Sequence, residues 1–288
     1  MTSATSKRNL AHVWTLPAVR RFRRNPLALL GLALILALVL TAALAPLLAP
    51  VSPDAQNLRM RLEPPSLTHP FGTDEFGRSV LSRTIYGARV SLFTGLVPVA
   101  LAATVGTLVG LAAGFYRGRV DTVLMRLMDV LLAFPSLLLA LAVVGALGPG
   151  LVNAVLAVAI VGIPQYARIV RSVVLSAREE DFVQAARALG AGDTRLLLRH
   201  ILPTAVGPLA VQATLGIGFA ILSMAGLSFL GLGVQPPTPD WGEMLARGRR
   251  YLPEATWLLA FPGVAISLTV LAFNLLGDGL RDALDPRD

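Results

Sequence analysis

The residues that could do chemistry in this 288-residue sequence are few and scattered. The chain contains no cysteine, so it offers neither a thiolate metal ligand nor a cysteine nucleophile. Its three histidines, His12, His69 and His200, lie far apart without a carboxylate cluster, and neither H-E-x-x-H nor G-x-S-x-G occurs. We therefore predict no catalytic residue and no metal site in this chain.

The sequence also lacks a nucleotide site of its own. A Walker A loop requires Gly-Lys followed by Ser or Thr, whereas the only lysine is Lys7, in the stretch "TSKRNL". A chain without this loop is either passive, as a channel or a scaffold, or receives work from another subunit. The residues alone leave both alternatives open.

Composition indicates where such a chain resides. Hydrophobic residues make up 55% of it and charged residues only 15%, whereas about a quarter of a soluble domain is charged. The net charge of +8 comes from cations that flank apolar runs, which is typical of membrane topology rather than of nucleic-acid binding. We predict an all-α integral membrane protein that contacts lipid and has no nucleic-acid partner.

Six apolar runs are long enough to cross a bilayer, which takes about 20 residues. The first run exceeds the apolar region of a cleaved signal peptide, so we expect it to remain as a helix. Pro208 and Pro262 lie in the last two runs, where a bend is tolerated. The predicted spans are residues 26–50, 90–114, 123–147, 151–169, 205–234 and 256–276.

The distribution of cations predicts the orientation of these spans. With the N-terminus in the cytoplasm, 17 Lys and Arg residues fall on the cytoplasmic side and 8 on the other, which favours both termini inside. Segment 181–203 then lies in the cytoplasm. The predicted organisation is a basic cytoplasmic segment 1–25, a first transmembrane helix 26–50, an extracytoplasmic segment 51–89, a five-helix membrane domain 90–281 and a cytoplasmic tail 282–288.

A second outward segment, 235–255, carries Trp241 and Tyr251, with Trp257 close behind. Aromatic residues at this level are typical of the belt at a membrane interface. They also suit a docking surface for an extracytoplasmic partner. The sequence leaves both interpretations open.

Segment 181–203, "DFVQAARALGAGDTRLLLRHILP", predicts a soluble helical hairpin between two apolar spans. Asp181 can cap its first helix, and Gly190 can supply the left-handed residue with which helices often end. One apolar face, which we expect to pack inward, recurs at i, i+3, i+4 and i+7. Its members are Phe182, Ala185, Ala186 and Leu189.

The second arm of the hairpin is predicted to run from Asp193, as its cap, to Pro203, which resists continuation of a helix. Leu196, Leu197 and Ile201 form its apolar side. Arg195 and Arg199 are expected to share the opposite side. Such an element is either a rigid knob that fits a partner's groove or an interfacial loop that packs only on its own helices.

The spacing within this hairpin resembles the EAA loop of permease subunits in ATP-binding-cassette (ABC) importers. The pattern is E-A-A, three residues, Gly, nine residues and I-x-L-P. Here Gln184 takes the Glu place and His200 the Ile place, whereas the other pattern positions match: Ala185, Ala186, Gly190, Leu202 and Pro203. The resemblance implies a coupling helix that docks on a cytoplasmic ATPase, to which the charge of Arg187, Arg195 and Arg199 would contribute.

Three further stretches resemble the C-type subunit of the dipeptide/oligopeptide/nickel permease family: "RRFRRNPLALLGLALI", "HPFGTDEFGRSVLSRTIYGARVSL" and "GLSFLGLGVQPPTPDWGEML". The resemblance implies the ABC importer type I permease fold with six transmembrane helices, in a bacterial or archaeal cytoplasmic membrane. It also implies a homologous second permease, two ATPase subunits and an extracytoplasmic substrate-binding protein. ATP and Mg would be bound by those ATPases, and this chain would hold no cofactor. We expect peptides as the cargo, with nickel or another small solute as the alternative.

An ion-coupled secondary transporter is a poorer match, because such proteins usually keep ionisable groups in mid-membrane. Asp129 is the main exception here, and a local pair with Arg126 would account for it. Gln165 and Gln212 suit either hydrogen bonds between helices or a polar path. Small residues in the fifth span indicate close packing and, in addition, a lining of the passage: Gly216, Gly218, Ser223, Gly226 and Ser228.

Overall fold

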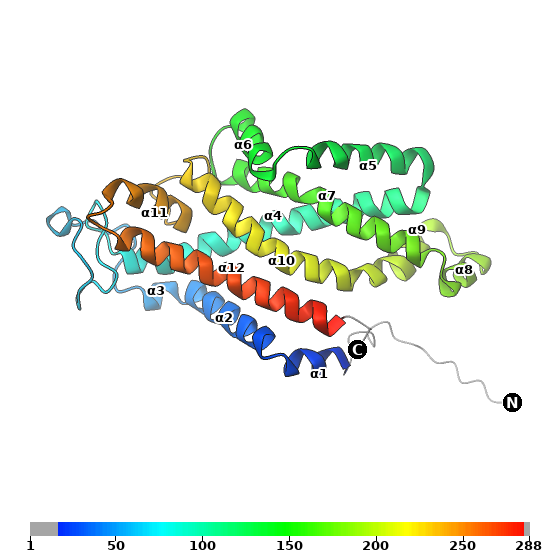
Figure 1. Cartoon of the computed structure of the whole chain (residues 1–288), viewed down its shortest axis with the longest axis horizontal. Helices are drawn as coiled ribbons and strands as arrows, with labels where there is room; N and C mark the ends of the chain where they lie inside the picture. Colours follow the sequence, from blue (N-terminus) through cyan, green and yellow to red (C-terminus); the bar gives the residue numbers. More distant parts are fainter. Residues whose placement is uncertain (1–16, 285–288) are drawn as a thin grey trace.

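The computed structural model describes residues 17–284, most of which are helical (Figure 1). No β-strand occurs in this part of the chain. The helical elements are α1 (Pro17–Arg24), α2 (Pro26–Ala43), α3 (Ala45–Leu48), η2 (Leu58–Met60), α4 (Val80–Tyr116), α5 (Gly118–Leu132), α6 (Ser136–Leu147), α7 (Leu151–Ala177), α8 (Asp181–Ala188), α9 (Asp193–Arg195), η3 (Leu196–Ile201), α10 (Leu202–Phe229), α11 (Trp241–Gly248), η4 (Arg249–Tyr251) and α12 (Trp257–Leu284). The predictions for residues 1–16 and 285–288, those on Lys7 and His12 included, lie outside the described residues.

Local capping explains where the long helices start. The Asn25 side chain accepts hydrogen bonds from the N–H groups of Leu27 and Ala28 and so caps α2. Pro26 occupies the first turn of α2, where its missing N–H removes no helical bond. Ser79 caps α4 in the same way through the N–H of Ser82.

Five unbroken helical stretches are long and apolar enough to span a bilayer: α2, α4, α7, the continuous run Asp193–Phe229, and α12. The predicted third span is not one straight helix. It breaks between α5 and α6, which meet at 94°. Pro135 explains the break, because proline cannot donate a backbone hydrogen bond and disfavours helical geometry in the residue before it.

Several predicted boundaries also shift; for example, α7 continues to Ala177, past residue 169. α4 starts at Val80, inside the segment expected to be an extracytoplasmic loop. The fifth span ends at Phe229, and α12 continues to Leu284, past the expected start of the tail. Pro208 and Pro262 both lie within continuous helices.

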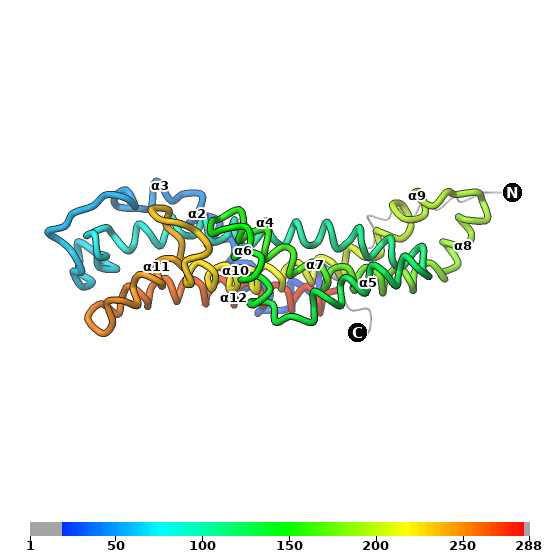
Figure 2. Tube along the Cα trace, turned by 90° about the horizontal axis from the view of Figure 1, so that it is seen from above, coloured from blue at the N-terminus to red at the C-terminus, as the bar shows by residue number. Residues whose placement is uncertain are grey.

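The helices form an elongated bundle, with most axes close to its long direction (Figure 1). The hairpin of α8 and α9 lies at one end, beyond the ends of α2 and α12. α11 and the long loop before α4 lie at the other end, and the view from above shows the same separation (Figure 2). Segment 181–203 and the predicted outward segments therefore occupy opposite ends of the bundle.

The most extensive helix contact among the described residues joins α4 to α7. Glycines at four-residue spacing on α4, Gly106, Gly110 and Gly114, face α7. A Cβ on Gly110 would stand 2.5 Å from the carbonyl oxygen of Ala167 and 2.7 Å from the Cβ of Val170. Only glycine permits this approach, which is the small-residue packing typical of membrane helices.

Candidate functional site

The hairpin is a short helix, a tight turn and a longer helical arm. α8 ends at Ala188, and Gly190 follows in the left-handed region with a φ of +83°. The two predicted aspartate caps are not formed, since Asp181 and Asp193 are the first helical residues after Glu180 and Gly192 and no side-chain cap bond is made. Their charge still lies at the positive end of each helix.

The apolar face of α8 is directed differently from the prediction. Val183 is the fully buried residue of this helix, and Ala186 is partly buried beside it. Phe182 and Leu189, which we expected to pack inward, are 46% and 89% exposed. The spacing of 182, 185 and 189 is correct for one helical face, but that face is directed away from the bundle. The tip of the hairpin therefore presents apolar side chains to its surroundings.

A separate core holds the hairpin on the bundle. Its buried members are Leu111, Phe115, Val170, Val174, Ala177, Val183, Leu196 and Ile201. Leu196 and Ile201 thus pack as predicted, whereas Arg195 and Arg199 are exposed. Pro203 does not end the second arm, because it lies in the first turn of α10, where proline is tolerated. A π-helical turn, Leu196–Ile201, joins the arm to α10 without a break.

The residues expected to couple to a partner divide between the tip and the base of the hairpin. Ala185, Arg187 and Gly190 are exposed at the tip. The side chain of Gln184 donates a hydrogen bond of 2.8 Å to the carbonyl of Arg178, which fastens α8 to the end of α7. The remaining three are partly buried: Ala186 beside Val183, and Leu202 and Pro203 at the base of the arm.

The opposite end of the bundle contains a buried ion network that sequence reasoning missed. Arg83 is 2% exposed, and its guanidinium lies 3.5 Å from Glu243, 3.6 Å from Asp54 and 3.8 Å from Asp74. It also donates to the carbonyls of Pro53 and Pro237. Arg83 therefore joins the long loop, α4 and the α11 region. Arg83, Asp74 and Glu243 lie within the stretches quoted above, but their spacing gave no sign of mutual contact.

The two tryptophans near this end are structural supports. Trp241 is 1% exposed, and its Nε1–H donates to the carbonyl of Thr84 at 2.9 Å. Trp257, which is partly buried, donates to the carbonyl of Thr73 at 3.1 Å. For Trp241, both the interfacial belt and the docking surface are wrong, because a buried indole can serve neither purpose.

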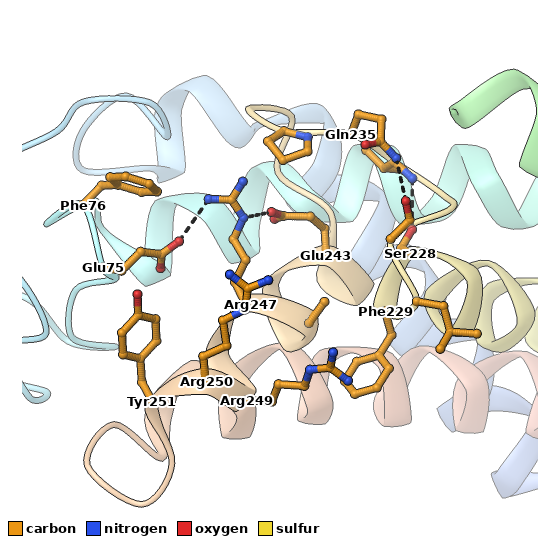
Figure 3. A pocket seen from close by; sticks show the side chains of 15 residues that line it. Glu75, Phe76, Ser228, Phe229, Gln235, Glu243, Arg247, Arg249, Arg250 and Tyr251 are labelled. Atoms are coloured by element: carbon orange, nitrogen blue, oxygen red, sulfur yellow. Dashed lines mark hydrogen bonds and ion pairs between the residues drawn. The ribbon is translucent and has the colours of Figure 1, made fainter. Parts of the chain in front are cut away.

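A pocket of about 450 Å³ lies beside this network (Figure 3). Arg247 bridges Glu75, at 3.0 Å, and Glu243 within it. Arg249 stacks 4.8 Å over the ring of Phe229. Neither Arg249 nor Arg250 forms an ion pair within residues 17–284.

Burial also perturbs two carboxyls at this end. It raises the pKa of the Asp240 side chain, although the N–H of Glu243 donates to that carboxylate. Burial raises the pKa of Glu243 as well, against the opposing effect of Arg247 and Arg83. Both carboxyls thus hold a proton more tightly than they would in water.

The small residues of α10 do not share one environment. A Cβ on Gly216 would stand 2.5 Å from the hydroxyl of Tyr166, at the wall of a second cavity. Gly218 instead faces α12, near Val270 and Asn274. The others lie further along the helix. Ser223 is partly buried, and a Cβ on Gly226 would stand 3.9 Å from the side chain of Leu137. Ser228 is buried, and its hydroxyl accepts a hydrogen bond from the N–H of Val234.

Several polar residues on exposed parts of the bundle pair across helices. Asp129 pairs with Arg168 of α7 at 2.7 Å and not with Arg126, so the predicted local pair is wrong. The side chain of Gln212 donates to that of Gln165 at 3.0 Å, as expected for an interhelical bond. No group of three or more potential metal-binding side chains occurs among residues 17–284.

The bundle and its protruding hairpin define a multi-pass membrane subunit that carries no nucleotide loop in its sequence. The chain belongs to the family described as binding-protein-dependent transport system inner membrane component, which matches residues 106–287. Residues 16–65 match the N-terminal TM domain of oligopeptide transport permease C. The resemblance to a C-type ABC permease with the type I fold is confirmed.

Curated relatives support the same family over most of the chain. The dipeptide transport system permease protein DppC of Alkalihalophilus pseudofirmus is 50% identical, over 94% of this chain and 89% of the relative. The di/tripeptide transport system permease protein DppC of Pseudomonas aeruginosa is 51% identical, over 92% and 90%. The glutathione transport system permease protein GsiD of Escherichia coli is 49% identical, over 93% and 89%.

Proposed function

We propose that this chain is one permease subunit of an ATP-driven importer of short peptides. The cargo is inferred from the names of the relatives, which specify dipeptides, di/tripeptides and glutathione. These names favour peptides over nickel. A homologous permease would complete the pathway, two cytoplasmic ATPase subunits would bind ATP and Mg, and an extracytoplasmic binding protein would deliver the cargo.

The exposed apolar stripe on α8 is the observation that supports the coupling role. Phe182, Ala185 and Leu189 lie on the face directed away from the bundle, and exposed apolar side chains at an end of a molecule favour a protein contact. The hairpin would place this stripe in a groove of an ATPase subunit. Its second arm continues into α10, so a movement of the ATPase would reach the membrane helices.

The mechanism we infer is alternating access. ATP would draw the two ATPase subunits together and shift the hairpin of each permease, which opens the pathway toward the binding protein. Hydrolysis would return the pathway to its inward-open state. This mechanism requires the hairpin and both termini to lie in the cytoplasm, as the distribution of cations favours.

The coupling role is tested by replacing Gly190 with Val. A Cβ at Gly190 would meet nothing within 4 Å, so the variant carries no clash. The cost is conformational, because left-handed geometry disfavours a residue with a side chain by about 1–2 kcal/mol and a β-branched one more. We expect normal membrane insertion with loss of peptide uptake and of transport-linked ATP hydrolysis in the reconstituted complex.

Gly192 provides the matched control. It is equally open but has a φ of −70°, which any residue adopts. Gly192→Val should retain uptake, and Gly190→Asn should restore part of it, because asparagine tolerates the left-handed region. Full coupled uptake by Gly190→Val would contradict the proposed role of the turn.

A further inference from the structure

The break between α5 and α6 exposes polar backbone within the apolar part of the chain. Residues 133–135 separate the two helices and are all exposed on this subunit. α6 begins after Pro135 without a side-chain cap, so its first N–H groups lack helical partners. At the end of α5, the N–H of Ala133 bonds to the carbonyls of Asp129 and Val130, whereas those of Leu131 and Leu132 have no partner within residues 17–284. Such backbone at membrane depth is tolerated only when it is buried in protein or lines a cavity.

A cavity of about 220 Å³ opens at this break. α4, α7 and α10 form its other walls, and Ser136 lines it at the start of α6. Its side-chain polar groups are uncharged: the amide of Gln165 and the hydroxyls of Tyr166 and Ser136. Tyr166 is 2% exposed, and its hydroxyl makes only a 3.5 Å hydrogen bond, to the carbonyl of Gln212.

The chemistry of the cavity selects the kind of ligand that would fit. No carboxylate, guanidinium or imidazole lines it, so it offers a bare divalent cation no anionic or nitrogen ligand and a charged peptide end no counter-charge. It does offer hydrogen-bond donors and acceptors together, beside apolar walls. A peptide main chain carries the complementary N–H and C=O groups. The volume is below that of pockets for drug-sized ligands, roughly 300 Å³ and above, so a short extended segment is the appropriate size.

We propose that this cavity binds the main chain of the peptide in transit, with Gln165, Tyr166 and the free backbone groups at the α5–α6 break as its partners. The proposal rests on the proposed function, from which the peptide comes. Recognition through the main chain would not depend on side-chain identity. Gly216 forms part of the wall on α10, so a shift of α10 would reshape the cavity around its ligand.

The direct test is photo-crosslinking in the complete transporter, reconstituted with its partners in proteoliposomes. A benzophenone amino acid replaces Val161 or Phe219, which line the cavity, or Val152, which lies on the same helix as Val161 but is 69% exposed. A labelled dipeptide is supplied with binding protein and ATP, and the sample is illuminated. We expect ATP-dependent labelling at positions 161 and 219 and none at 152. Dipeptides with different side chains should label these positions alike.

A substitution provides the second measurement. Gln165→Leu should lower the rate of dipeptide uptake by about 5–30-fold, the effect of losing one or two hydrogen bonds to the bound peptide. Val152→Leu should leave uptake unchanged. The affinity of the binding protein for the peptide is measured separately and is common to all variants.

The outcomes separate this inference from the proposed function. Absence of ATP-driven peptide uptake by the wild-type complex would overturn both. Two outcomes would overturn the main-chain subsite alone. One is normal uptake without labelling at positions 161 and 219, and the other is crosslinking of these positions to the partner permease instead of to the peptide. Wild-type uptake rates in Gln165→Leu would also count against the subsite.

Discussion

Asp240 shows at the residue scale how the outer end of the bundle depends on a buried acid. Its carboxylate accepts from the N–H of Glu243 at 3.1 Å and caps α11, while the Ser91 hydroxyl donates to it at 3.4 Å. These bonds fix the start of α11 and favour the charged carboxylate, whereas burial disfavours that charged form. The side chain thus serves a structural purpose at an electrostatic cost.

The pH dependence of stability should reveal this cost. The folded-state pKa of Asp240 is raised, so the folded protein binds the proton more tightly than the unfolded chain, and stability falls as pH rises through that pKa. We expect the thermal midpoint of the detergent-purified wild-type protein to rise as the pH is lowered from neutrality toward 3.8, the ordinary pKa of an aspartate side chain. Asp240→Asn keeps a cap without the charge and should weaken this dependence.

Asp54→Asn provides the control, because it removes a carboxylate whose side chain is 55% exposed. It should retain the pH dependence of the wild-type protein. An unchanged dependence in Asp240→Asn would show that other groups dominate this range.

At the scale of elements, the contact between α4 and α7 predicts where added volume is not tolerated. Gly110→Val would force the two helices apart, because the new Cβ would meet the backbone of α7. Overpacking of this kind costs about 1–3 kcal/mol. Fluorescence-detected gel filtration should show a lower thermal midpoint and a lower yield of folded protein for Gly110→Val than for the wild type.

Gly145, on α6, is the matched control, since a Cβ there meets nothing within 4 Å. Gly145→Val should leave the thermal midpoint unchanged. Equal midpoints for the two variants would contradict the close approach of α4 and α7.

The elements also show what sequence reasoning could and could not predict. The spans were predictable because crossing a bilayer imposes a length and an apolar composition that soluble helices rarely meet. Which face of α8 packs on the bundle was not predictable, because periodicity identifies an apolar stripe without saying on which side the bundle lies. Here Val183, outside the predicted stripe, takes the buried position. The break at Pro135 was missed because total apolar length does not detect a change of direction.

The candidate site residues likewise include some that a local sequence pattern predicts and some that it does not. A spacing pattern was enough to locate the hairpin and to indicate Gly190, where the backbone itself requires glycine. The network around Arg83 depends on contacts between residues more than a hundred positions apart in the chain, Arg83 and Glu243 among them. No local pattern encodes such a pairing.

At the scale of the whole molecule, the two ends should lie on opposite sides of the membrane. The chain has no cysteine, so one introduced residue can be labelled alone. Leu67 is fully exposed in the long loop and Leu189 is 89% exposed on the hairpin. A membrane-impermeant maleimide should label Leu67→Cys in intact cells and Leu189→Cys only after permeabilisation. The reverse result would invert the orientation and remove the hairpin from the reach of a cytoplasmic ATPase.

The unbroken run Asp193–Phe229 makes the hairpin arm and the wall at Gly216 parts of one rod. At 1.5 Å per residue, its 37 residues extend over roughly 55 Å. A stiff rod delivers displacement along its length without needing a chain of switching side chains. The fidelity of transmission would then depend on bending stiffness at two interruptions of regular α-helical hydrogen bonding, the π-helical turn at Leu196–Ile201 and Pro208.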